Sequence, residues 1–122
     1  MTMPAVTSLN GLPVAAMPTD VDVANAALVG EQLAGAVTHD APCLVLDLTG
    51  TRYLDSAGID MLLKLAERLR NRRQTLLLVV AEGSPLRRLL TVMGVDASLP
   101  VHASVAEAAE SGGGGPGTLS PR

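Results

Sequence analysis

The spacing of apolar positions changes along the chain, and each spacing predicts a different element. Two short apolar runs, residues 5–9 and 13–17, flank Asn10-Gly11, a dipeptide typical of a tight β-hairpin. The segments Cys43–Leu48 and Thr75–Ala81 are almost continuously apolar. Unbroken apolar runs of this length indicate strands that are covered on both faces, as in parallel sheets.

Helical spacing marks the segments that follow these strands. Asp22 is a candidate N-cap for a helix over Val23–Val37, and the strongest helical pattern covers Ser56–Arg73. The first helix should bury Ala27, Leu28, Leu33, Ala34 and Val37. The second should bury Ile59, Leu62, Leu63, Ala66 and Leu69. Met61 and Leu65 fall beside this second stripe, so we expect them to be partly exposed.

Two shorter helices are predicted towards the end of the chain. Ser84 is a candidate N-cap, Pro85 suits the first helical position, and Gly94 suits the left-handed residue that ends a helix. The inner positions of this helix are Leu86, Leu89, Leu90 and Met93. A short edge strand over 99–101 and a last helix over Ser104–Glu110 follow.

Strand–helix–strand–helix order with short links predicts right-handed crossovers and parallel strand pairing, and the hairpin adds antiparallel pairing. We therefore predict one small α/β domain over residues 1–110, with a mixed central sheet and about four surrounding helices. Residues 111–122 are rich in Gly, Pro and Ser, and we predict a disordered tail there. The loops at the carboxyl ends of parallel strands meet, so Asp20 and Asp22 should lie near Asp55 and Ser56.

Composition narrows the function classes. The chain has one Tyr, no Phe and no Trp among 122 residues, so its core must be aliphatic and it offers no platform for stacking bases. The net charge is −3, which argues against direct binding of nucleic acid. The charge is uneven: residues 1–61 carry −6 and residues 62–122 carry +3.

The single cysteine, Cys43, cannot form an internal disulfide or a cysteine zinc site, and we expect it to be a small buried hydrophobe. No apolar run is long enough to span a bilayer, and the N-terminus lacks the basic start of a signal peptide. These features predict a cytoplasmic protein that does not insert into a membrane. We also expect a monomer or weak dimer that needs no cofactor and no metal.

Ser56 stands where a buried strand passes into a helix. The first turn of a helix has backbone N–H groups without partners and a partial positive charge, so a hydroxyl there is either a cap or a site that tolerates a phosphate. Catalysis by Ser56 would need a general base, and no pattern places His39 or His102 beside it. The segment also lacks the G-x-S-x-G motif. We predict that the chain is not an enzyme.

Nearby carboxylates have ordinary explanations as well. Asp20, Asp22, Asp55 and Asp60 could supply acid–base groups or ligands for a hard cation. A structural role is the better explanation for each: Asp22 suits a helix cap, and Asp60 suits the first turn of a helix because the helix dipole favours a negative charge there. No glycine-rich phosphate-binding loop is present.

The order of these elements resembles the STAS domain of bacterial anti-sigma factor antagonists. The resemblance covers about residues 5–110 and is carried by Leu44–Leu48, Leu54–Gly58, Ser84–Leu90 and Met93-Gly94-Val95. It implies that Ser56 is phosphorylated by a partner anti-sigma factor that is also a serine kinase. In this view the unmodified protein binds the anti-sigma factor and releases a sigma factor, and phosphorylation switches binding off.

The resemblance also implies a contact surface around the serine. We expect the partner to touch the acidic turn, the first turn of the second helix, and the two apolar residues beside its inner stripe: Asp20, Asp22, Asp55, Ser56, Ala57, Gly58, Asp60, Met61 and Leu65. For Met61 and Leu65 the alternative is that they only cover the edge of the sheet. STAS domains also serve as regulatory subunits of membrane transporters or of stress-signalling complexes, and that remains an alternative function.

Overall fold

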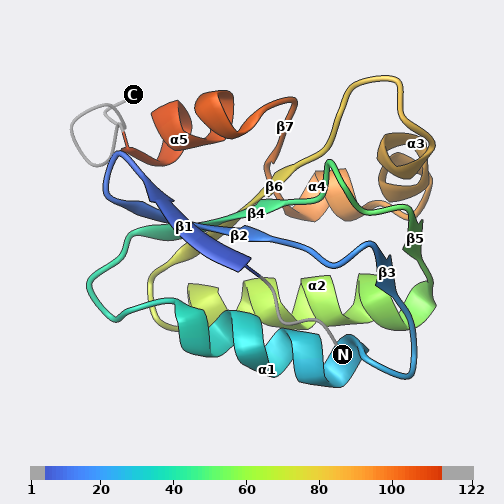
Figure 1. Cartoon of the computed structure of the whole chain (residues 1–122), viewed down its shortest axis with the longest axis horizontal. Helices are drawn as coiled ribbons and strands as arrows, with labels where there is room; N and C mark the ends of the chain where they lie inside the picture. The colour runs from blue at the N-terminus through green and yellow to red at the C-terminus, as the bar shows by residue number, and fades with distance from the viewer. Residues whose placement is uncertain (1–4, 114–122) are drawn as a thin grey trace.

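The structure is a computed structural model that describes residues 5–113, and it begins with the predicted hairpin (Figure 1). Strands β1 (Ala5–Leu9) and β2 (Leu12–Ala16) pair antiparallel. Asn10 and Gly11 between them have φ angles of 54° and 82°. Two left-handed residues in succession are what a type I′ turn requires, and asparagine followed by glycine accepts them with little strain.

The main sheet has the strand order β1-β2-β4-β6-β7, and every pair after the hairpin is parallel. Its other strands are β4 (Cys43–Asp47), β6 (Thr75–Val79) and the short edge strand β7 (Val101–His102). The prediction of a single α/β domain with a mixed sheet is therefore confirmed. A second sheet, which the sequence analysis did not predict, joins β3 (Asp20–Val21) to β5 (Tyr53–Leu54) in parallel.

Helices cover both faces of the main sheet, which explains the unbroken apolar runs of β4 and β6. The long helices α1 (Ala26–Ala36) and α2 (Ser56–Arg70) pack on one face, and α5 (Val105–Gly113) covers the other (Figure 1). Side chains of β4 alternate between the two layers: Leu44 and Leu46 face the long helices, and Cys43 and Val45 face α5. The expected burial of Cys43 is confirmed.

The helices after β6 follow the predicted signals in part. Helix α3 (Pro85–Val92) begins at Ser84, whose Oγ accepts a hydrogen bond from the Arg87 N–H at 3.1 Å. Gly94 has a φ of 76°, and Val95 after it is fully buried. Val95 begins a fifth helix, the single turn α4 (Val95–Ser98), whereas about four helices were expected. Met93, predicted to face inward, is 49% exposed.

The start of α1 corrects the sequence analysis. The helix begins after Asn25, three residues later than expected, and Asp22 is not its N-cap. Asp22 instead belongs to a turn in which its Oδ1 accepts from the Ala24 N–H, while its own N–H donates to Asn25 Oδ1, both at 2.9 Å. The later start rotates the buried stripe by one position, so Ala26 and Val29 are buried, whereas Ala27 and Leu28 are exposed.

The buried residues of helix α2 also differ from the sequence prediction. Met61 and Leu65 are buried, with exposed fractions of 7% and 3%, while Leu63 is 38% exposed. The sequence stripe assumed one buried face towards the sheet, but α2 also packs against α1, and this second contact buries Met61 and Leu65.

The predicted ends of helices α2 and α5 were also wrong. Helix α2 ends at Arg70, where Arg73 was expected. Helix α5 continues to Gly113, so the last helix ends later than the predicted Glu110, and residues 111–113, which were expected in the tail, are helical. The remainder of the predicted tail, residues 114–122, lies outside the described residues.

Candidate functional site

The two-stranded sheet brings the acidic turn beside the serine segment. Asp20 pairs with Tyr53 and Val21 with Leu54, and the Asp55 N–H donates to the Val21 carbonyl at 3.2 Å. Residues more than thirty positions apart in the sequence are therefore held side by side by backbone hydrogen bonds. The predicted proximity of the acidic turn to Asp55 and Ser56 is confirmed.

Asp55, not Ser56, caps helix α2. The Asp55 Oδ1 accepts hydrogen bonds from the Ala57 N–H at 2.9 Å and the Gly58 N–H at 3.1 Å. Ser56 is the first helical residue, its side chain is exposed, and its Oγ makes no hydrogen bond to any of residues 5–113. The capping role that a serine at such a junction usually takes is already filled. The hydroxyl of Ser56 is thus free to meet another molecule.

Gly58 fixes how closely the first turn of α2 approaches the small sheet. A Cβ at this position would lie 3.0 Å from Leu54 Cγ and 3.3 Å from Val21 Cγ1, and closer still to Leu54 Cδ1. Leu54 and Val21 are both buried, so neither has open space to move into. Only glycine lets the turn that carries Ser56 rest directly on β3 and β5.

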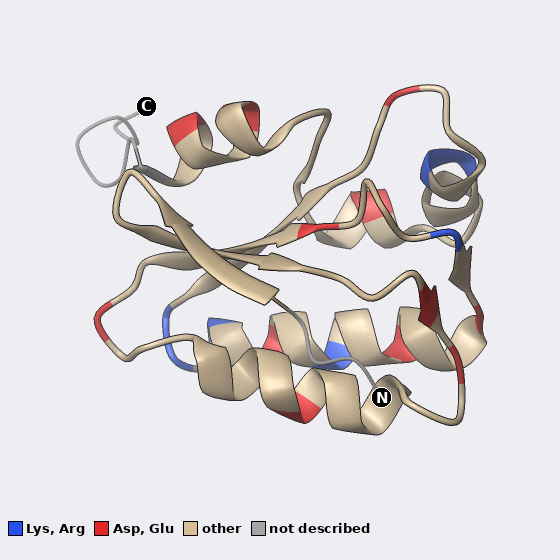
Figure 2. Cartoon of the chain, viewed as in Figure 1, with Lys and Arg blue, Asp and Glu red and all other residues tan. Residues whose placement is uncertain are grey.

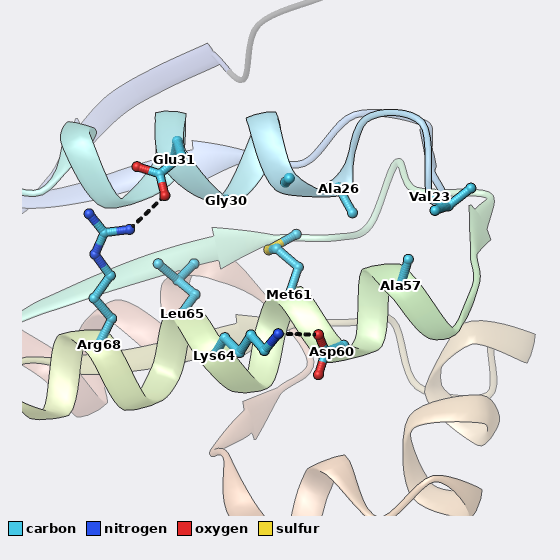
Figure 3. Close-up of a pocket in the computed structure, with 11 residues that line it drawn as sticks. Val23, Ala26, Gly30, Glu31, Ala57, Asp60, Met61, Lys64, Leu65 and Arg68 are labelled. Carbon is cyan, nitrogen blue, oxygen red and sulfur yellow. Dashed lines mark hydrogen bonds and ion pairs between the residues drawn. The ribbon is translucent and has the colours of Figure 1, made fainter.

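The rest of the predicted contact surface continues along α2 into a groove beside α1. This groove has a volume of about 370 Å³ and separates the two helices on their outer side (Figure 3). Figure 3 shows Ala57, Met61 and Leu65 rising from α2 towards α1, where Gly30 gives Met61 room. Met61 and Leu65 therefore form the buried floor of a groove instead of an exposed patch.

Two ion pairs border the groove. Lys64 Nζ lies 2.9 Å from Asp60 Oδ2 within α2, and Arg68 Nη1 lies 3.0 Å from Glu31 Oε2 on α1 (Figure 3). The hydrogen bond that Lys64 donates to the Asp60 carboxylate raises the pKa of Lys64 above its usual value, so this ammonium stays charged. Exposed pairs such as these contribute little to stability, but they neutralise the charge along the border of the groove.

The sequence analysis missed residues that the structure places at this site. Tyr53, the one aromatic residue of the chain, is 53% exposed on β5. Alternation along a strand would have put it opposite the buried Leu54, but a strand of two residues has no pattern to detect. Glu31 and Arg68 are separated by 37 positions, so no local signal links them.

The two histidines, which are the usual general bases for a serine, lie outside helix α2, where Ser56 is found. His39 follows the end of α1, and His102 lies on β7 at the edge of the main sheet, where its Nδ1 is 3.9 Å from Glu107 Oε1. Neither hydrogen-bonds to Ser56. Within residues 5–113, no three His, Cys, Asp or Glu side chains are grouped as metal ligands would be. Over the same residues, no helix has the length and apolar character needed to cross a membrane.

The chain matches a family model and is similar to a curated relative named as an anti-sigma factor antagonist. The family model described as "STAS domain" matches residues 3–108. The anti-sigma-F factor antagonist RsfB of Mycobacterium tuberculosis is 28% identical over 99 residues, which cover 81% of this chain and 80% of that protein.

Solved structures agree on the fold. A crystal structure of an anti-sigma factor antagonist from Mycobacterium paratuberculosis superposes with a TM-score of 0.78 at 22% identity, covering 90% of this chain and 92% of that one. The Bacillus cell fate determinant SpoIIAA, solved in a phosphorylated form, superposes with a TM-score of 0.59 at 15% identity, covering 88% of this chain and 97% of that one.

Proposed function

Because the chain belongs to the STAS domain family, we propose that it is an anti-sigma factor antagonist whose binding is controlled at Ser56. The unmodified protein binds an anti-sigma factor with serine kinase activity in the cytoplasm, and this binding frees a sigma factor. Phosphorylation of Ser56 by the partner ends the interaction. The relatives named as anti-sigma factor antagonists support the general role.

The observation that carries the proposal is the division of roles between two neighbouring residues. Asp55 satisfies the helix N-terminus, and Ser56 presents an exposed, uncommitted hydroxyl one residue later. A kinase can reach such a hydroxyl without unfolding the helix. SpoIIAA, a protein of the same fold, exists in a phosphorylated form, which supports the idea that this fold accepts the modification.

A phosphate on Ser56 would change the contact surface strongly. It adds about −1.5 to −2 charges where the partner has met a small neutral hydroxyl. The carboxylates of Asp20, Asp22 and Asp55 already lie close to this position, as the red bands in Figure 2 show at the strand β3 and the start of α2. Placing a buried charge without a matched partner costs several kcal/mol, which corresponds to a hundredfold or greater loss of affinity.

Binding measurements on substituted proteins test the switch. Ser56→Ala should bind the anti-sigma factor permanently, because it cannot be modified, and Ser56→Asp should bind at least tenfold more weakly than wild type. Ser98→Asp is the matched control, since Ser98 is an exposed serine at the end of α4. Mass spectrometry after incubation with ATP and the partner should find one phosphate on wild type and none on Ser56→Ala. Equal binding by Ser56→Asp and Ser56→Ala would refute the proposal.

A further inference from the structure

The outer surface of α1 is unusually poor in charge for a helix that faces water. Among Ala26–Ala36 the one charged residue is Glu31, and it is paired with Arg68. Leu28 is 51% exposed, and Val23, just before the helix, is 82% exposed. Apart from Glu31, the exposed positions of α1 are Ala27, Leu28 and Gly35, and an apolar helix surface is normally covered. The exposed side of α1 therefore has the character of a contact surface.

The groove between α1 and α2 adjoins this surface and continues from the Ser56 region. Its lining begins with Val23, which follows Asp22, and with Ala57, which follows Ser56. It then runs between the helices over Ala27, Gly30 and the side chain of Met61 (Figure 3). A partner that contacts the Ser56 hydroxyl therefore finds an apolar groove directly beside it.

The groove favours a helix as its occupant. An added strand would need free backbone N–H and C=O groups, and the two helices that form the walls use theirs internally. A helix from another molecule packs well between two neighbouring helices, because its side chains fill the depression between them. Within each of the two ion pairs at the border the opposite charges neutralise each other, so side chains that enter between the pairs should be uncharged.

Charge argues against a second copy of this chain as the occupant. In a twofold symmetric pair a patch on the symmetry axis meets its own copy, so an interface centred on the Ser56 end of the groove would bring two acidic ends together. Asp20, Asp22 and Asp55 lie at the Ser56 end of the groove, and Arg52 is the one cation among residues 1–61. An occupant with basic residues at that end is complementary instead.

We infer that the groove between α1 and α2 receives an amphipathic helix of the anti-sigma factor, with apolar side chains between the helices and basic residues towards Asp22. This inference rests on the proposed function and adds a second contact that does not depend on the phosphorylation state. The hydroxyl of Ser56 then decides whether the complex forms, and the groove supplies affinity and selects the partner.

Charged substitutions in the groove test the inference against the anti-sigma factor kinase that the wild-type chain binds. Val23→Glu and Ala27→Glu each place a carboxylate in the apolar lining at an exposed position. Ala106→Glu is the matched control, because Ala106 is also an exposed helical alanine but lies on α5, which covers the opposite face of the sheet. Thermal unfolding of all three variants should match wild type within a few degrees, which separates loss of contact from loss of fold.

We expect Val23→Glu and Ala27→Glu to raise the dissociation constant at least tenfold and Ala106→Glu to change it less than twofold. If Ser56→Asp abolishes binding while all three Glu variants bind like wild type, the groove inference is overturned and the proposed switch stands. If Ser56→Asp binds like wild type, the proposed function fails and the inference falls with it. If Ala27→Glu instead converts a wild-type dimer into a monomer in sedimentation without weakening partner binding, the occupant is a second copy and the inference is wrong.

Discussion

Replacing Gly58 by alanine tests whether a close contact holds the first turn of α2 in place. In most helices this substitution stabilises by up to about 1 kcal/mol, because alanine loses less conformational entropy than glycine. Here the new Cβ would lie 3.0 Å from Leu54 Cγ and 3.3 Å from Val21 Cγ1. Leu54 is 5% exposed and Val21 fully buried, so the strain cannot be relieved by a side chain moving into solvent.

Overpacking of this kind costs about 1–3 kcal/mol. The favourable helix propensity of alanine offsets part of this cost, so we expect Gly58→Ala to lower the free energy of unfolding by about 1–2 kcal/mol. Urea denaturation measures the free energy directly. In thermal unfolding the loss should appear as a decrease in Tm of about 4 °C per kcal/mol for a domain of this size.

Gly35→Ala is the matched control, because an added Cβ at Gly35 in α1 would meet nothing within 4 Å. It should stabilise the protein by about 0.5 kcal/mol. Leu54→Val combined with Gly58→Ala should cost less than the two single changes together, since the shorter side chain frees the space that the new methyl group needs. If Gly58→Ala proves as stable as Gly35→Ala, the close approach of α2 to β5 does not position the Ser56 turn.

Two further predictions concern the cap and the thiol. Asp55→Ala should lower the free energy of unfolding by about 1 kcal/mol in urea denaturation, because it removes the cap of α2. Asp55→Asn should retain most of the wild-type stability, because asparagine caps helices equally well. Equal losses in the two variants would contradict the assignment of the cap. Burial raises the pKa of the Cys43 thiol above 9.0, so the unfolded state releases its proton first, and the stability that is present below pH 9.0 declines as the pH rises above it. Cys43→Ala should show a smaller decline across the same pH range in parallel denaturation experiments, and identical pH profiles for the two proteins would contradict the argument.

Local signals in the sequence were sufficient for most of the framework. Asn10-Gly11 predicted the hairpin, Ser84-Pro85 predicted the start of α3, and the apolar run from Cys43 predicted a strand covered on both faces. Each of these signals acts through a few neighbouring residues. Their physical cause is local: backbone angles, caps and alternating burial are decided within one turn or one strand.

The errors arose where distant segments decide the outcome. Asp22 has the chemistry of an N-cap, but the pairing of β3 with β5 holds it in the preceding turn, and Asn25 takes the position before the helix. Met61 and Leu65 lie outside the stripe that faces the sheet, yet the contact with α1 buries them. No count of apolar positions within one helix can reveal which second helix will pack against it.

Because Asp55 caps the helix and Ser56 carries the proposed modification, a phosphate on Ser56 should affect partner binding and not the stability of the fold. The helix N-terminus favours the added charge by about 0.3–1 kcal/mol. The adjacent Asp55 carboxylate opposes it, and Asp60, one helical turn away, opposes it by about 0.2–0.5 kcal/mol. These terms nearly cancel at an exposed position. Because Asp55 alone makes the cap, the modification removes no hydrogen bond that holds α2 in place. The fold should therefore be almost equally stable with and without the phosphate, and the several kcal/mol needed for a switch must come from the partner surface that meets residue 56.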